Sequence, residues 1–156
     1  MKAQLRDELG DFSSIVCLKA IITGMEEALG EKATAIALIA AGRARGREIA
    51  KNLNLSMEQG LDAVTQQVSD VLGKDGTRLM LLKRIEEIEE GFRVSVLETV
   101  CSAGEEQGSE RRCTFTLGAA QGVLEAITEQ RYRGVHTESV LRGGDHDVFE
   151  YTRIIR

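Results

Sequence analysis

Cysteine and glycine are the residues of this sequence whose spacing suggests chemistry. Cys113 precedes Gly118 and Gly122 in the pattern Cys-x4-Gly-x3-Gly. Glycines four residues apart lie on one face of a helix, where a second backbone or a flat apolar ligand can approach closely because no Cβ intervenes. A second pair, Gly42 and Gly46, has the same spacing. The groove beside such glycines must be filled, either by the protein itself or by a ligand.

The other candidates for chemistry are few. Cys17, Cys101 and Cys113 form no Cys-x2-Cys pair and leave one cysteine over in any disulfide scheme, so we expect reduced thiols. The two histidines, His136 and His146, give acid–base catalysis few candidates. Phosphate-binding loops, dinucleotide-binding turns and the hydrolase nucleophile elbow have no match in the sequence. We therefore predict no catalytic residues, no enzymatic activity and no cofactor.

Length and charge limit the class of protein further. The chain has 156 residues, 42% of them hydrophobic, which fits a single domain over residues 1–156. Its 20 basic residues are interleaved with 25 acidic ones, which argues against a nucleic-acid-binding role. The charged residues 1–8 lack the apolar part of a signal peptide, and no apolar run is long enough to span a membrane. These features predict a cytoplasmic protein without a transmembrane segment.

Three helices are expected in the first half of the chain, over residues 11–29, 33–53 and 56–71. The first has apolar residues at spacings of three and four, with Asp11 or Ser13 as N-cap and Gly30 after its end. Residues 33–41 are apolar on nearly every side and are compatible with a buried strand or a buried helix, although their alanines favour a helix. Ser56 to Gln59 form a capping-box pattern at the start of the third helix.

The sequence pattern of the second half of the chain predicts four strands and one helix. We expect strands over 78–88, 92–100, 135–141 and 148–154, with the Cys113 helix between the two pairs. The polar residues 103–112 contain two glycines and are expected to form a mobile loop. The resulting order, αααββαββ, predicts an α+β fold with a helical layer on a four-stranded antiparallel sheet.

This element order, the Gly42-Arg43-x-x-Gly46 helix, and the Cys113-x4-Gly118-x3-Gly122 helix before a glycine-turned hairpin resemble the 4-vinyl-reductase domain family. The resemblance extends from about Ser13 to Arg153. It implies a fold similar to that of the small subunits of the transport-protein-particle tethering complex, with dimerisation through the helices. It also implies a pocket between helices and sheet for a small hydrophobic molecule, which differs among members: phenolic effectors, an acyl chain or tetrapyrroles.

The resemblance also raises the question of a metal. In phenol-sensing members the cysteine at the position of Cys113 is a zinc ligand, together with a glutamate and two cysteines of the closing hairpin. The hairpin of this chain contains Glu138 but no cysteine, so the four-ligand site cannot be completed in that way. His136, His146 and Asp145 are alternative ligands, but a histidine near aspartates at a hairpin tip is more often solvated. We expect no metal.

Residues and resemblance together predict a non-enzymatic, homodimeric domain that binds a hydrophobic small molecule such as a tetrapyrrole or an aromatic compound. The expected ligand-binding residues come from the two glycine helices: Cys113, Phe115, Leu117, Gly118, Gln121, Gly122, Gly42 and Gly46. The dimer is expected through the N-terminal helices, because their apolar surface exceeds what a small sheet covers. Two alternatives are open: an adaptor protein with a filled core that acts through protein partners, and an enzyme acting on tetrapyrroles.

Overall fold

The computed structural model describes residues 6–12 and 14–155. Its helices and strands are α1 (Ile15–Leu29), α2 (Glu31–Asn52), α3 (Leu61–Leu72), β1 (Leu81–Ile88), β2 (Gly91–Leu97), α4 (Phe115–Thr128), β3 (Tyr132–Glu138) and β4 (Asp147–Arg153). Two short 3-10 helices, η1 (Met57–Gln59) and η2 (Val140–Arg142), complete the described elements. The predicted order αααββαββ is confirmed.

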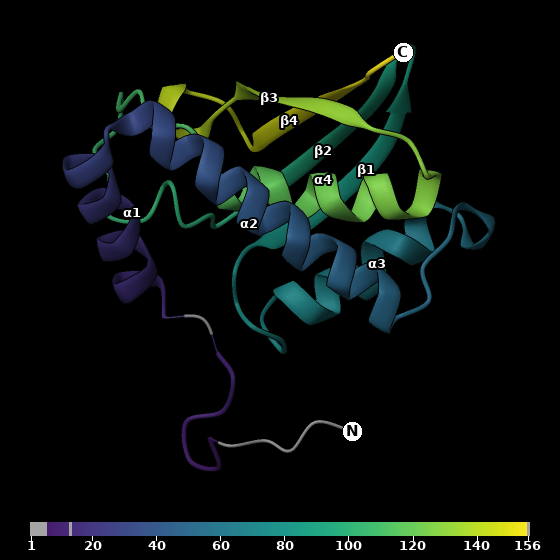
Figure 1. Cartoon of the computed structure of the whole chain (residues 1–156), viewed down its shortest axis with the longest axis horizontal. Coiled ribbons are helices and arrows are strands. Elements are labelled where there is room, and N and C mark those ends of the chain that lie inside the picture. Colours follow the sequence, from purple (N-terminus) through teal and green to yellow (C-terminus); the bar gives the residue numbers. More distant parts are fainter. Residues whose placement is uncertain (1–5, 13, 156) are drawn as a thin grey trace.

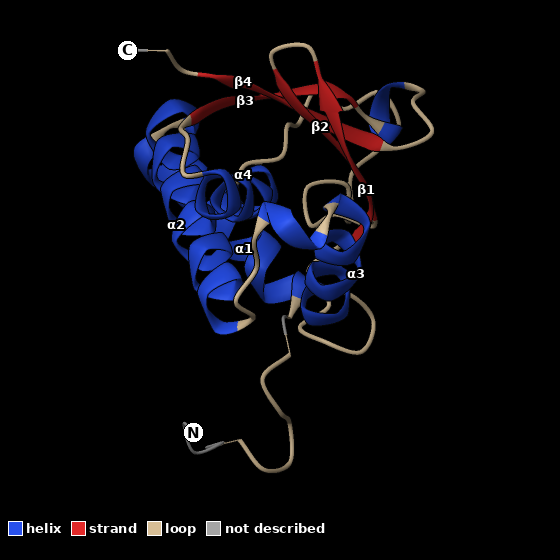
Figure 2. Cartoon of the chain, turned by 90° about the vertical axis from the view of Figure 1, so that its right-hand side faces the viewer, coloured by secondary structure: helices blue, strands red, loops and turns tan. Residues whose placement is uncertain are grey.

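The four strands form one antiparallel sheet in the order β1-β2-β4-β3. Helix α4 lies between this sheet and α2, and α3 packs beside β1 (Figures 1 and 2). Along β2, the alternate side chains of Phe92, Val94 and Val96 are buried, as expected for a sheet with helices on one face. The α+β fold with a helical layer is thus confirmed.

Helix α2 settles the ambiguity of residues 33–41. They lie inside a helix of 22 residues, in agreement with their alanine content. Gly30 separates α1 from α2 with φ of 86°, a backbone conformation that favours glycine. Ser14 caps α1 by accepting a hydrogen bond from the backbone N–H of Cys17, so the expected cap at Asp11 is wrong, and Ser13 lies outside the described residues.

Several boundaries differ from the expected ones. Gly60, with φ of 84°, divides the expected third helix, so the Ser56 capping box caps the start of the 3-10 helix η1, and α3 begins at Leu61. Strand β2 ends at Leu97 because Glu98 adopts a left-handed conformation with φ of 52°. Strand β3 begins earlier than expected, at Tyr132, since Gln121 and Glu125 of α4 hold the backbone there.

Candidate functional site

The two glycine pairs meet where α2 crosses α4. A Cβ added to Gly42 or Gly46 would overlap backbone atoms of α4, and one added to Gly118 or Gly122 would overlap the carbonyl groups of Ile39 or Arg43 in α2. The four glycines therefore bring the two helix backbones into contact, as small residues do at close helix crossings. Of the two ways to fill the groove beside Gly118 and Gly122, the protein uses its own helix. The glycine faces are thus not open to a ligand.

The opposite side of α4 is closed by the sheet. Gln121 donates from Nε2 to the carbonyl oxygen of Tyr132 at 2.7 Å, and the hydroxyl of Tyr151 donates to the carbonyl oxygen of Leu117 at 2.6 Å. Phe149 and Tyr151 are fully buried beneath the helix, and burial raises the pKa of Tyr151. Side chains thus fill the space between α4 and the sheet. Gln121 and Leu117 hold the helix on the sheet, and a ligand-binding role for these residues stays a prediction.

Charged side chains reinforce the same crossing. Glu125 of α4 is buried and accepts hydrogen bonds from Arg43 at 2.8 Å and from Arg47 at 3.0 Å, both on α2. Its second oxygen accepts from the backbone N–H of Tyr132 at 3.1 Å. Burial opposes ionisation of Glu125, but these hydrogen bonds hold its pKa below the usual value. Two arginines of α2 are thus paired with one glutamate of α4.

An open cavity lies elsewhere, between α1, α2 and the segment from Glu105 to Thr114. Its volume is about 800 Å³. Ile22 of α1 and Ala35 and Leu38 of α2 supply apolar lining, and the remaining lining residues are polar or charged. Only three of the fourteen lining residues are apolar, so this cavity is more polar than most small-molecule sites, and its apolar surface is confined to the side of α1 and α2.

The segment 103–112, expected to be a mobile loop, is anchored to α1 by ion pairs. Lys19 donates to the carbonyl oxygen of Ala103 at 2.7 Å and to the carboxylate of Glu105 at 2.8 Å. Arg111 contacts the carboxylate of Glu26 at 2.6 Å. Hydrogen bonds from Lys19 and from the hydroxyl of Ser109 lower the pKa of Glu105 to about 2. Contacts with α1 therefore fix this segment as one wall of the cavity.

Three polar groups of the cavity wall have unused binding capacity. Arg112 and Arg142 both donate to backbone carbonyl oxygens, and no carboxylate among the described residues lies within ion-pair distance of either guanidinium. The hydroxyl of Thr34 is buried and has no hydrogen-bond partner within the described chain. Unpaired cations and an unpaired buried hydroxyl favour a ligand that brings an acidic or polar group.

The cysteines beside this cavity differ from the expected reduced state. Cys101 and Cys113 form a disulfide with their Cα atoms 5.3 Å apart, so the expectation of reduced thiols is wrong for this pair. Both are buried, whereas Cys17 is free and exposed. Because Cys113 directly precedes Thr114 and follows Arg112, the disulfide adjoins two lining residues of the cavity.

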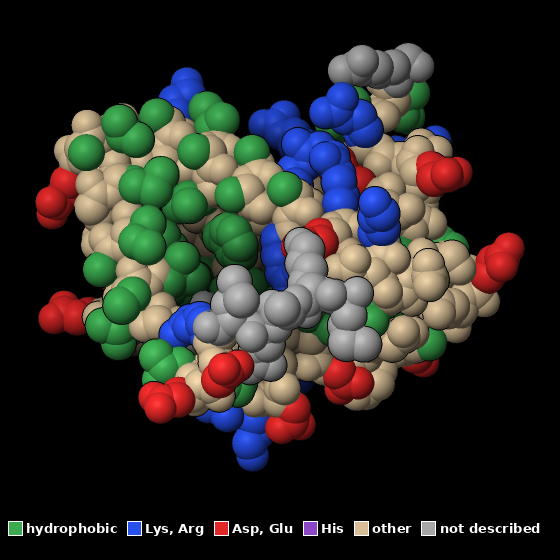
Figure 3. All heavy atoms as spheres, turned by 60° about the horizontal axis from the view of Figure 1, so that its bottom comes forward, with side chains coloured by type: hydrophobic (Ala, Val, Ile, Leu, Met, Phe, Trp, Pro, Cys, Tyr) green, Lys and Arg blue, Asp and Glu red, His purple; other side chains and the backbone are tan. Residues whose placement is uncertain are grey.

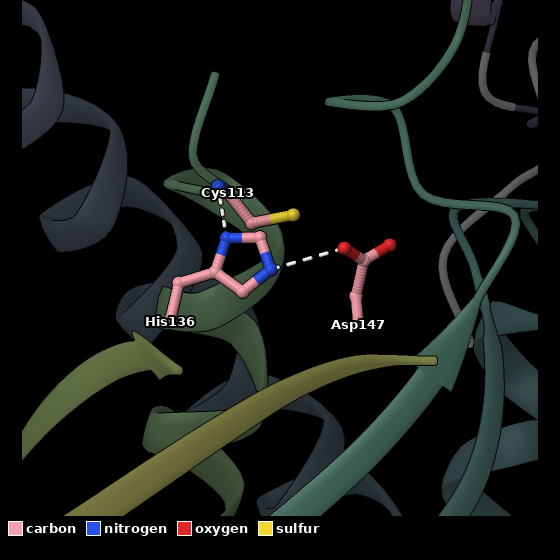
Figure 4. Close-up of side chains that lie close together, drawn as sticks. All are labelled: Cys113, His136 and Asp147. Carbon is pink, nitrogen blue, oxygen red and sulfur yellow. Dashed lines mark hydrogen bonds and ion pairs between the residues drawn. The ribbon is translucent and has the colours of Figure 1, made fainter. Parts of the chain in front are cut away.

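His136 and Asp147 lie next to Cys113 (Figure 4). The backbone N–H of Cys113 donates to Nδ1 of His136 at 3.1 Å, which leaves the ring proton on Nε2 to donate to Asp147 at 3.0 Å. Burial alone would raise the pKa of Asp147, but hydrogen bonds from His136 and Ser139 hold it below the usual value. His136 is thus buried, and the expectation that it is a solvated hairpin-tip residue is wrong.

Cys113, His136 and Asp147 place potential metal ligands within 4.8 Å of one another, which tests the zinc implied by the resemblance. In this arrangement the three residues do not fit a zinc ion. The sulfur of Cys113 is bonded to Cys101 and is not a thiolate. Nδ1 of His136 accepts a backbone N–H and Nε2 carries the proton, so neither nitrogen has a free lone pair. The cluster is a hydrogen-bonded pair beside a disulfide.

No family model and no curated protein sequence matches the chain. Several solved structures share its fold, among them the two that follow. The phenol-responsive sensory domain of the transcription activator PoxR, solved with phenol, is 13% identical with a TM-score of 0.68, over 91% of this chain and 75% of that chain. Trafficking protein particle complex subunit 3 from Naegleria fowleri, covalently bound to palmitic acid, is 14% identical with a TM-score of 0.59, over 90% and 93%. At such identities the likeness concerns the fold alone, and it is the fold that the sequence resemblance implied.

Sequence reasoning missed the residues that frame the cavity. Thr34, Arg112 and Arg142 are far apart in the sequence and follow no motif, so only the folded chain brings them together. The disulfide had a signal in the sequence, because Cys101 and Cys113 flank the polar segment 102–112. Within the described residues, the structure contains no helix of the length and apolarity needed to cross a bilayer.

Proposed function

We propose that this domain binds a small hydrophobic molecule that carries an acidic or polar group, in the cavity between α1, α2 and segment 105–114. The observation that carries this proposal is the combination of an apolar lining at Ile22 and Leu38 with the guanidinium groups of Arg112 and Arg142, which pair with no carboxylate of the described residues. The site differs from the groove predicted beside Gly118, which helix α2 fills.

The volume of the cavity is compatible with the ligand classes expected from the sequence. Its volume of about 800 Å³ lies within the range of small-molecule sites, roughly 300–1,000 Å³. An aromatic acid, a fatty acid or a tetrapyrrole carboxylate would bury its apolar part against α1 and α2 and place its carboxylate near Arg112 and Arg142. The phenol and the palmitic acid in the two similar folds support a hydrophobic ligand of this kind. The proposed role is binding without catalysis.

Titration with three acids tests the proposal: palmitate, a benzoate and a porphyrin carboxylate, each followed by calorimetry. Binding is expected to be lost in Ala35→Phe, because the added ring occupies the apolar part of the cavity. The matched control is Ala44→Phe, at an exposed position of α2 that does not line the cavity. If all three acids fail to bind, or if both variants bind as well as the unmodified chain, the cavity is not the site.

A second candidate is the adaptor or assembly role, and an exposed apolar surface favours it. Four large hydrophobic residues of α1 and α2 are more than half exposed: Val16 (82%), Ile21 (55%), Leu29 (61%) and Ile36 (65%). Figure 3 shows hydrophobic side chains gathered on the part of the surface that carries α1. Exposed apolar patches of this kind mark protein–protein contacts. The proposed first partner is a second copy of the chain, as predicted for the N-terminal helices, and this assembly is compatible with ligand binding.

A further inference from the structure

The disulfide closes a short covalent loop that forms one wall of the cavity. Cys101 follows the end of β2 and Cys113 precedes the start of α4, twelve residues later. Between them lie Glu105, Ser109 and Arg111, which line the cavity. The position of this wall therefore depends on a bond that thiols can break.

The side chains around the disulfide form a continuous hydrogen-bond network. Thr99 contacts Cys101 at 3.0 Å and donates to Asp147 at 3.3 Å. Asp147 in turn accepts from His136, whose other ring nitrogen accepts the backbone N–H of Cys113. Every group that would ligate a metal already has a partner within this network, and the network itself is satisfied without one.

We infer that the Cys101–Cys113 disulfide, in place of a metal ion, fastens segment 102–112 to the start of α4, and that its reduction loosens this wall of the cavity. The inference concerns the empty protein and does not require that the proposed ligand binds. Cross-linking of a short loop stabilises it mainly by restricting the open chain. Other contacts, such as the hydrogen bond from Gly108 to Leu141, stay in place, so a local loosening is expected and not global unfolding.

The chemistry is a two-electron thiol–disulfide exchange. A thiolate of dithiothreitol attacks one protein sulfur, which breaks the Cys101–Cys113 bond, forms a mixed disulfide and releases the other cysteine as a thiolate. The second thiol of dithiothreitol then attacks the mixed disulfide, closes the cyclic dithiothreitol disulfide and releases the second cysteine. The protein gains two electrons and two protons. In the reverse direction, glutathione disulfide accepts the electrons and leaves as two glutathione thiols. Both protein sulfurs are buried, with residue exposures of 5% and 3%, so exchange requires the segment to open first.

Thiol counting and limited trypsin digestion test the inference on the full chain. Protein purified without reductant and then denatured should show one reactive thiol, from Cys17, and three after reduction. Trypsin should cut after Arg111 or Arg112 roughly tenfold faster in the reduced protein, because cleavage follows the open population of the segment. Addition of EDTA should change neither result.

Two variants serve as controls. Cys101→Ser should show fast cleavage with or without dithiothreitol, whereas Cys17→Ser, at the exposed free cysteine, should behave like the unmodified protein. Three reactive thiols before reduction, together with one zinc ion per chain by mass spectrometry, would overturn the inference in favour of a metal site. Equal cleavage rates in the oxidised and reduced proteins would also overturn it. If the acids failed to bind in the cavity, the thiol count and the trypsin cleavage rates would be unaffected.

Discussion

Arg43 of α2 and Glu125 of α4 are joined by two N–H groups that share one carboxylate oxygen, at 3.0 Å from Nε and 2.8 Å from Nη2. The backbone of the same arginine lies against Gly122, one turn before Glu125 on α4. The ion pair and the glycine contact are thus two parts of one helix crossing. Because α4 also carries the sheet contacts, this crossing joins the helical layer to the sheet.

Gly122→Ala should destabilise the protein, because its Cβ would overlap the carbonyl group of Arg43 in a neighbouring backbone that cannot rotate away. We expect a loss of about 1–3 kcal/mol in the free energy of unfolding, the range of overpacked cores, measured by urea denaturation. The matched control is Gly24→Ala in α1, whose added Cβ meets no atom within 4 Å. It should gain up to about 1 kcal/mol from helix propensity. Equal effects at both positions would contradict the close crossing.

Glu125→Gln should cost about 2–4 kcal/mol of unfolding free energy, since it leaves the guanidinium groups of Arg43 and Arg47 facing a neutral amide in a largely buried site. Glu48→Gln is the control, because Glu48 is exposed and, within the described residues, its ion pair is with Arg45 on its own helix. Its effect should stay within about 0.5 kcal/mol. Chemical denaturation of the three proteins at neutral pH provides the comparison, and a neutral result for Glu125→Gln would show that the ion pair adds nothing.

The stabilisation by Glu105 should depend on pH. Hydrogen bonds from Lys19 and Ser109 lower its pKa in the folded protein from 4.5 to about 2. A lowered folded pKa means that the stabilisation is present above the unfolded pKa and is lost as the pH falls towards the folded one. The difference in melting temperature between the unmodified protein and Glu105→Gln should therefore shrink as the pH falls from about 5 to 2. A difference that is constant with pH would exclude this contribution.

Ile21→Glu combined with Ile36→Glu should dissociate the proposed dimer. The two side chains are exposed on α1 and α2, and a carboxylate at each would have to be buried in an apolar contact. Analytical ultracentrifugation at micromolar concentration should show a dimer for the unmodified chain and a monomer for the variant. Val135→Glu, at an exposed position on β3, is the control and should stay dimeric. A monomeric unmodified chain would exclude the homodimer.

The sequence supports strong predictions where a local signal dominates. The alternation of apolar residues along β2 and the helical spacing in α3 each report which face is buried, because the period of a helix or a strand acts within a few residues. Boundaries were less predictable. Gly60 and Glu98 end or divide elements through single backbone conformations, and a left-handed glutamate has no clear signature in the sequence.

The candidate site was only partly predictable for a different reason. The sequence alone determined that Gly42, Gly46, Gly118 and Gly122 permit close approach, since a missing Cβ is a property of the residue. Only the tertiary structure decided what approaches: the two helices fill each other's grooves, and the cavity opens beside α1 instead. Likewise, the pairing of Cys101 with Cys113, and the position of His136 beside Asp147, depend on which strands and loops become neighbours. Such contacts between residues distant in the chain are set by the packing of the whole fold.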